Sequence, residues 1–129
     1  MTTQYDIAIV GAGLVGQAIA AALSCSTKTS LRIALIDPAD LSEPAISAAV
    51  SDYDLRVSAL TAQSQAFLSR IGAWDKIPTQ VLSPYQRMHV WDAEGTGSVT
   101  FDAADLHVPA LGHIVENRQT LWALNRVIE

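Results

Sequence analysis

Three glycines near the N-terminus have a spacing that suits a backbone wrapped around phosphate groups. Gly11, Gly13 and Gly16 form the pattern GxGxxG directly after the apolar residues 5–10. Gly11 permits a tight turn, Gly13 has no Cβ to hold a pyrophosphate away, and Gly16 lets a helix press onto a strand. The unpaired N–H groups at the start of that helix would face the phosphates. The pattern therefore predicts a binding site for the pyrophosphate of a dinucleotide.

An acidic residue follows these glycines at the distance that a ribose contact requires. Asp37 ends a second apolar run, residues 31–36, about twenty residues after the glycines. A carboxylate at this place can accept hydrogen bonds from an adenosine ribose, and it would repel a 2′-phosphate. We therefore expect FAD or NAD, and not NADP, as the dinucleotide. The alternative is a strand, turn and helix in which the glycines are incidental.

The glycines and Asp37 need two strands and a helix to hold them in place. Residues 14–24 carry an apolar face wide enough to lie on a sheet, and we expect this helix to be buried on most sides. A helix between the two apolar runs predicts a parallel βαβ unit. The fold class indicated is α/β, with a Rossmann-like dinucleotide-binding fold.

The chain then departs from the strand and helix rhythm. Residues 39–54 are typical of a long loop. Thr61 can cap a helix that stops at Gly72. Residues 87–92 and 98–102 alternate on either side of a glycine turn, which predicts a β-hairpin that leaves the first sheet for a second, antiparallel one.

A short strand and a helix are expected at the C-terminal end. Residues 114–116 are strand-like, and Asn117 can cap a helix with Leu121, Leu124 and Ile128 on one face.

Composition excludes several classes of protein. The 129 residues are 50% hydrophobic and 16% charged, as in an ordinary globular domain and not a disordered chain. A net charge of −5 argues against nucleic acid as a partner. One cysteine allows no internal disulfide and no metal site. No apolar run is long enough to span a membrane, so we expect a cytoplasmic chain.

Two further stretches, taken with the glycine pattern, resemble a known family. They are residues 54–60, Asp-Leu-Arg-Val-Ser-Ala-Leu, and residues 111–118, Leu-Gly-His-Ile-Val-Glu-Asn-Arg. The chain is similar over essentially its whole length to the N-terminal part of the FAD-dependent ring hydroxylases of ubiquinone biosynthesis. These belong to the aromatic-hydroxylase group of flavoprotein monooxygenases typified by para-hydroxybenzoate hydroxylase.

The resemblance implies a monooxygenase with FAD as cofactor. Its partners would be NAD(P)H, O₂ and a polyprenylated phenol or benzoquinol ring, and it leaves open a peripheral position at the inner membrane or in a biosynthetic complex. Residues 1–80 and 110–129 would form an incomplete FAD-binding domain, and residues 81–109 the start of a substrate-domain sheet. Members of the group are about three times as long, and their second FAD motif, a Gly-Asp pair, has no counterpart here. We therefore expect part of a longer enzyme that is inactive by itself. Two apolar faces without partners, that of the terminal helix with Leu121, Leu124 and Ile128 and that of the hairpin from Val90 to Phe101, would cause self-association. The alternative is a stand-alone NAD- or FAD-binding module without catalysis.

Carried over by position, the resemblance also implies cofactor contacts beyond the glycines and Asp37. Arg56 would approach the cofactor from the loop after the second strand, and Asn117 and Arg118 would face it from the start of the last helix. Each has an alternative: Arg56 as a surface cation, Asn117 as a helix cap only, and Arg118 with Glu116 as a solvated ion pair. No catalytic residue and no metal ligand is assigned.

Overall fold

The computed structural model describes residues 4–26, 30–39, 43–44, 46 and 53–129. Most of the loop expected over residues 39–54 lies outside these ranges. The helices and strands follow along the chain as β1 (Ile7–Val10), α1 (Leu14–Ser24), β2 (Ile33–Ile36), β3 (Val57–Thr61), α2 (Ala62–Arg70), the 3₁₀ turns η2 (Trp74–Lys76) and η3 (Thr79–Val81), β4 (Ser83–Tyr85), β5 (Arg87–Trp91), β6 (Ser98–Asp102), β7 (Gly112–Glu116) and α3 (Asn117–Ile128).

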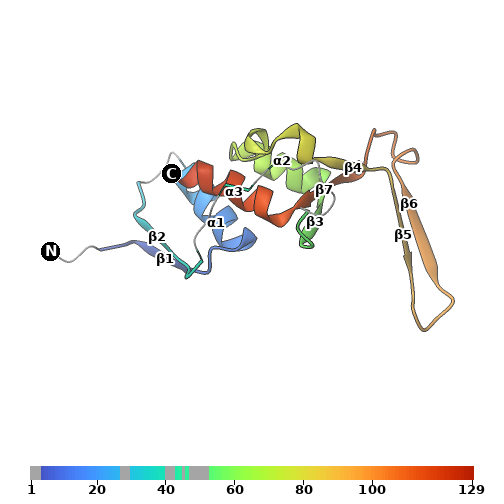
Figure 1. Ribbon diagram of the computed structural model, residues 1–129, viewed down its shortest axis with the longest axis horizontal. Coiled ribbons are helices and arrows are strands. Elements are labelled where there is room, and N and C mark those ends of the chain that lie inside the picture. Colours follow the sequence, from blue (N-terminus) through green and yellow to red (C-terminus); the bar gives the residue numbers. More distant parts are fainter. Residues whose placement is uncertain (1–3, 27–29, 40–42, 45, 47–52) are drawn as a thin grey trace.

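The first three elements form the predicted parallel βαβ unit. β1 and β2 pair in parallel, with Ile7 opposite Ile33 and Val10 opposite Ile36. α1 connects them, and it lies alongside α3 in the middle of the molecule (Figure 1). The glycine turn therefore sits between the end of β1 and the start of α1, as the sequence pattern indicated.

The helix α1 is buried on one side only. Gln17, Ala20 and Ala21 are buried, whereas Val15 is 74% exposed and Ile19 is 47% exposed. The expectation that this helix would be buried on most sides is wrong. Its small residues face the other helices, and its β-branched side chains Val15 and Ile19 lie on the outer side.

A three-stranded antiparallel sheet lies beside the helices, with β7 between β3 and β4. The close approach of β3 leaves no room for a side chain at Gly112, at the start of β7. A Cβ there would lie 2.2 Å from the carbonyl oxygen of Leu60. Val115 in this strand packs with Ile77 and Ala123, which joins the sheet to α3.

The predicted boundaries of α2 are confirmed. The Thr61 hydroxyl accepts a hydrogen bond from the Ser64 N–H at 3.2 Å, which satisfies a donor in the first turn. Gly72, with φ +75°, takes the left-handed conformation after the last turn, where glycine is favoured.

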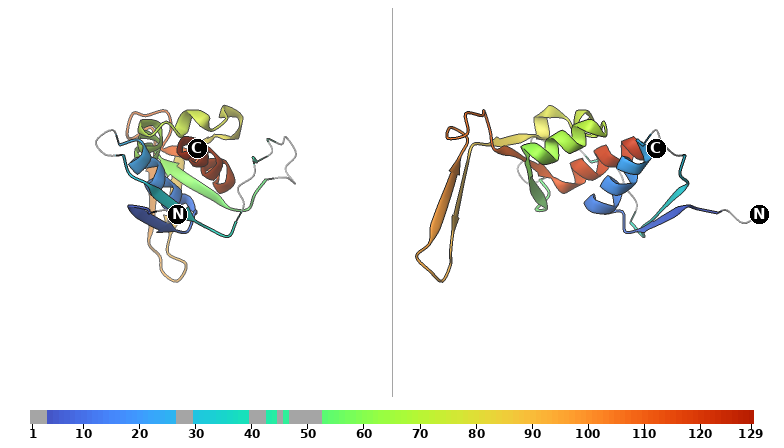
Figure 2. Two further views of the ribbon diagram at one scale, coloured as in Figure 1. Left: turned by 90° about the vertical axis from the view of Figure 1, so that its left-hand side faces the viewer. Right: turned by 180° about the vertical axis from the view of Figure 1, so that it is seen from behind.

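The predicted hairpin is also confirmed and extends away from the helices. β5 and β6 pair antiparallel in a sheet of their own. The right-hand view of Figure 2 shows the hairpin at the opposite end of the molecule from β1 and β2. Met88 pairs with Phe101 and Val90 with Val99, so four apolar side chains share one face, and all four are exposed.

The terminal helix α3 is covered, contrary to expectation. Leu124 is 1% exposed and belongs to the core cluster with Ala21, Leu68 and Ile71. The prediction that this face of α3 lacks a partner is therefore wrong, and of the two apolar faces named for self-association only the hairpin is open. The mixed α/β class is confirmed. Beyond the first βαβ unit, a Rossmann-like sheet stays a prediction, because the other described strands pair antiparallel.

Candidate functional site

The three glycines of the turn differ in what a side chain at each position would meet. Gly11 has φ +101°, a conformation that disfavours side chains. Gly16 approaches the turn so closely that a Cβ would lie 1.9 Å from the Gly11 carbonyl oxygen. Gly13 is different, because its φ of −70° suits any residue and a Cβ there would have no described protein atom within 4 Å. None of the described residues fills the space in front of Gly13, which leaves that space open to a ligand.

Asp37 is tied to the glycine turn from the end of β2. Its Oδ2 atom accepts a hydrogen bond from the Ala12 N–H at 2.6 Å, and its Oδ1 atom accepts one from the Ala39 N–H at 2.8 Å. These bonds, that from Ala12 first, hold the pKa of Asp37 below the ordinary value for aspartate. The exposed carboxylate is therefore an anion at neutral pH, and a carboxylate has further acceptor sites for ribose hydroxyls.

A pocket of about 430 Å³ lies over the glycine turn. It has the size of many ligand sites. Its walls come from the turn, from the segment before β3 and from the first turns of α1 and α3, and its lining residues are Gly11, Gly13, Leu14, Val15, Gly16, Asp54, Arg56, Asn117, Arg118 and Leu121. Of the seven predicted cofactor contacts, all of which the structure describes, only Asp37 stands outside this lining.

Two helix N-termini meet at this pocket. α1 begins at Leu14 and α3 at Asn117, and both residues line it. The unsatisfied N–H groups and partial positive charge of each helix start favour an anion. Arg56 and Arg118 bring two formal positive charges, which are balanced by Asp54 in the lining and by Glu116, the ion-pair partner of Arg118. The suitability of the pocket for an anion therefore rests on the two helix starts and on the arginine N–H donors.

Backbone and side-chain hydrogen bonds join the Arg56 segment to the start of α3. The Asn117 N–H donates to the Arg56 carbonyl oxygen at 2.8 Å, and the Arg56 N–H donates to Asp54 Oδ1 at 2.9 Å. The Ser58 hydroxyl donates to Asn117 Oδ1. Asn117 is thus the first residue of α3 and not its cap, so the predicted capping role is wrong. Glu116 holds the cap position, and the Asn117 side chain bonds to β3 instead.

Glu116 and Arg118 form an ion pair whose carboxylate is buried, while the Arg118 side chain is 35% exposed. Glu116 Oε2 lies 2.6 Å from Arg118 Nε, and the Glu116 side chain is only 8% exposed. The same oxygen accepts the Asp54 N–H at 2.8 Å. The interpretation of this pair as a solvated one is therefore wrong. The sequence analysis gave Asp54 no role, and it placed Glu116 at the start of the cofactor-facing helix without a contact of its own. The signal for both residues was the resemblance of residues 54–60 and 111–118.

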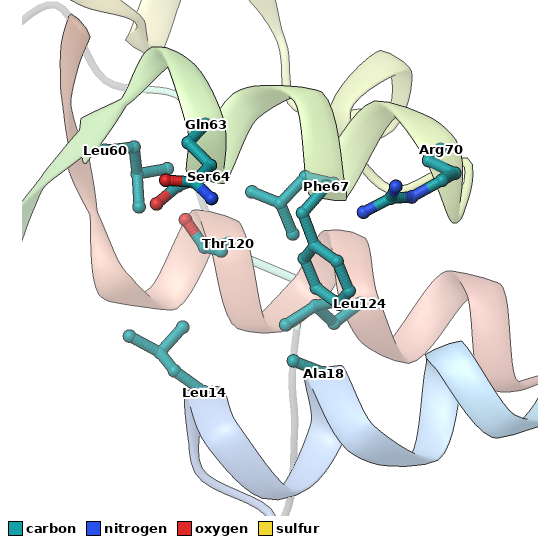
Figure 3. Close-up of a pocket in the computed structure, with 10 residues that line it drawn as sticks. Leu14, Ala18, Leu60, Gln63, Ser64, Phe67, Arg70, Thr120 and Leu124 are labelled. Atoms are coloured by element: carbon teal, nitrogen blue, oxygen red, sulfur yellow. The ribbon is translucent and has the colours of Figure 1, made fainter.

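A second pocket, of about 440 Å³, lies where the three helices meet. Figure 3 shows Leu14, Ala18, Phe67 and Leu124 pointing toward one another from α1, α2 and α3, with Arg70 at one side. The lining is mainly apolar, and the seven predicted cofactor contacts lie outside it. We assign it no role.

The described residues hold neither a cluster of metal ligands nor a membrane-spanning helix. Among them, no group of three or more His, Cys, Asp or Glu side chains is placed to hold a metal ion. In the part of the chain that the structure covers, no helix is long and apolar enough to cross a membrane.

Known proteins resemble this chain along almost all of its length. No model of a known protein family matches it. The chain is 41% identical over 126 residues to 3-demethoxyubiquinol 3-hydroxylase of Escherichia coli strain K12, covering 95% of this chain and 30% of that protein. It is 37% identical to the mitochondrial ubiquinone biosynthesis monooxygenase COQ6 of Xenopus tropicalis, and 34% identical to that of Homo sapiens, covering 97% and 98% of this chain and 26% of each protein. The chain is therefore a homologue of the ubiquinone-biosynthesis hydroxylases that spans about a quarter to a third of their length.

Proposed function

We propose that this chain is the FAD-binding portion of a flavoprotein monooxygenase that hydroxylates a polyprenylated phenol or benzoquinol ring in ubiquinone biosynthesis. NAD(P)H and O₂ would be its co-substrates. The observation that carries the proposal is the pocket over the glycine turn, in which Gly11, Gly13 and Gly16 face Arg56 and Arg118. The homology to hydroxylases and monooxygenases of this pathway supports the reaction class.

The residues present fit the adenosine and pyrophosphate parts of FAD. The open space at Gly13 is where a pyrophosphate needs close approach to the backbone. Two helix starts and two arginines supply N–H donors and positive charge to it. Asp37 at the end of β2 would accept the ribose hydroxyls.

In this proposal the chain binds and orients while the cofactor supplies the redox chemistry. A bound flavin can accept a hydride from NAD(P)H and activate O₂, which amino-acid side chains cannot do. The glycine turn and Asp37 would fix the adenosine end, and Arg56, Asn117 and Arg118 would set the direction in which the rest of the cofactor leaves the pocket. The proposed domain division places residues 1–80 and 110–129 around the cofactor and 81–109 in a substrate sheet. The separate sheet of β5 and β6 supports it, whereas β4, within 81–109, pairs with β7.

A chimera tests the proposal directly. The matching segment of the Escherichia coli hydroxylase would be replaced by this chain, and the chimera expressed in a strain that lacks that enzyme. We expect the chimera to purify with FAD and to restore ubiquinone synthesis, whereas the same chimera with Gly13→Val should do neither. A folded chimera without flavin would contradict the proposal, and binding of NAD in place of FAD would favour the stand-alone module.

A further inference from the structure

Glu116 lies just behind the wall of the pocket over the glycine turn. Its neighbours Asn117 and Arg118 line that pocket, whereas Glu116 lines a different one, of about 350 Å³, with Tyr53 and Ile114. The residue is 6% exposed. A carboxylate is costly to bury unless it is paired, so its contacts explain why it is there.

Those contacts reach both cationic sides of the pocket. Oε2 of Glu116 meets Arg118 Nε at 2.6 Å and accepts the Asp54 N–H at 2.8 Å. Asp54 in turn accepts the Arg56 N–H through its side chain. One buried oxygen therefore joins the first turn of α3 to the segment that carries Arg56.

The contact with Arg118 sets the direction of its guanidinium. Nε is the nitrogen closest to the main chain, and the guanidinium is a rigid plane with N–H groups in a fixed fork. The ion pair keeps Nε within 2.6 Å of a buried carboxylate oxygen, which restricts the orientation of the guanidinium plane and of its terminal N–H groups. Arginine binds phosphate best when this fork is oriented in advance, because less side-chain freedom is then lost on binding.

We propose that Glu116 is a positioning residue for the anion site, which orients Arg118 and holds the Arg56 segment against α3. The role rests on the proposed FAD site. Glu116 acts through its neighbours, and the ligand class is the pyrophosphate of an adenine dinucleotide.

The sign of one substitution separates this role from simple electrostatics. Glu116→Gln removes a negative charge near an anion site, so a background charge effect would tighten the binding of an anion. Loss of positioning would weaken it. We expect Glu116→Gln to weaken ADP binding roughly fivefold to tenfold, because the ion pair that orients Arg118 is lost.

The experiment uses the complete 129-residue chain and ADP as the probe, with affinity measured by NMR titration. Asp102→Asn is the matched control, because it removes one negative charge from the Arg87–Asp102 pair on the hairpin. It should leave ADP affinity within about twofold. In a double-mutant cycle, Glu116→Gln should add little to Arg118→Gln if it acts through Arg118. Tighter or unchanged binding by Glu116→Gln, or full additivity, would overturn the role of Glu116.

A second variant covers the case in which Glu116→Gln fails to fold. Arg118→Lys keeps the charge but has neither Nε nor a planar fork, so it should lose ADP affinity by a similar factor. An unchanged affinity in Arg118→Lys would likewise overturn the role. If the unsubstituted chain bound no ADP, the proposed cofactor site would fail, and this role with it.

Discussion

Replacing Gly13 and Gly16 one at a time should separate ligand binding from folding. Gly13→Val leaves an allowed backbone, because φ −70° and ψ −177° are extended values that β-branched residues adopt readily. The new side chain would meet no described protein atom near its Cβ. Loss of glycine freedom in the unfolded chain stabilises by about 0.4–1 kcal/mol, and the poorer helix cap costs a similar amount. The free energy of unfolding should therefore change by less than about 1 kcal/mol.

Gly16→Ala should do the opposite. Its Cβ would lie 1.9 Å from the Gly11 carbonyl oxygen, a backbone atom that cannot swing aside. Such overpacking costs about 3 kcal/mol at the upper end of its range, and better helix propensity returns about 1 kcal/mol. We expect a net loss of about 2 kcal/mol in the free energy of unfolding.

Two measurements test this pair of variants. Urea unfolding followed by circular dichroism gives the free energy of unfolding, and NMR titration with ADP gives the affinity. Gly13→Val places methyl groups in the proposed pyrophosphate space, so ADP binding should fall roughly ten- to a hundredfold while stability holds. If Gly13→Val bound ADP normally, or unfolded as easily as Gly16→Ala, the assignment of the open space to a ligand would be refuted.

Three further predictions concern Asp37 and the hairpin. In the chimera, Asp37→Ala should weaken FAD binding roughly ten- to a hundredfold, because charge-assisted hydrogen bonds to the ribose are lost, and an unchanged dissociation constant in a flavin titration would count against it. Hydrogen bonds from the Ala12 and Ala39 N–H groups lower the pKa of Asp37 in the folded chain. The ionised carboxylate should therefore stabilise the fold fully above about pH 3.9, and this stabilisation should be lost as the pH falls through the lowered pKa. A pH titration of the NMR chemical shift of the Ala12 amide with a midpoint above about pH 3.9 would contradict this. The 129-residue chain should self-associate through the exposed apolar face of its hairpin. The double variant Val90→Lys with Phe101→Lys should therefore lower the mass measured by sedimentation, whereas Thr100→Lys, on the other face, should leave the mass unchanged. Persistent association of the double variant would refute the hairpin as the contact.

Local signals explain what could be predicted from the sequence. The glycine turn, the start of α2 at Thr61 and the hairpin depend on residues close together in the chain, and all were predicted. Burial of Glu116 was not, because its partner Asp54 is 62 residues away. The exposure of Val15 was missed for a related reason, since periodicity identifies an apolar face but not which neighbour covers it. The placement of Arg56 beside the glycines came from the resemblance and not from any pattern in the residues.

The central place of β7 in its sheet has a consequence for the order in which the pocket forms. The glycine turn is held by β1, α1 and β2, which are neighbours in sequence and can assemble early. The side of the pocket that carries Arg56 and Arg118 depends on β7 and α3. The hydrogen bond from Ser58 to Asn117 spans 59 residues of sequence, and that from Asp54 to Glu116 spans 62. Contacts of that separation carry a loop-closure cost and form slowly. We therefore expect the glycine turn to form before the side of the pocket that carries Arg56 and Arg118, and a ligand that bridges the two would stabilise the contacts that close last.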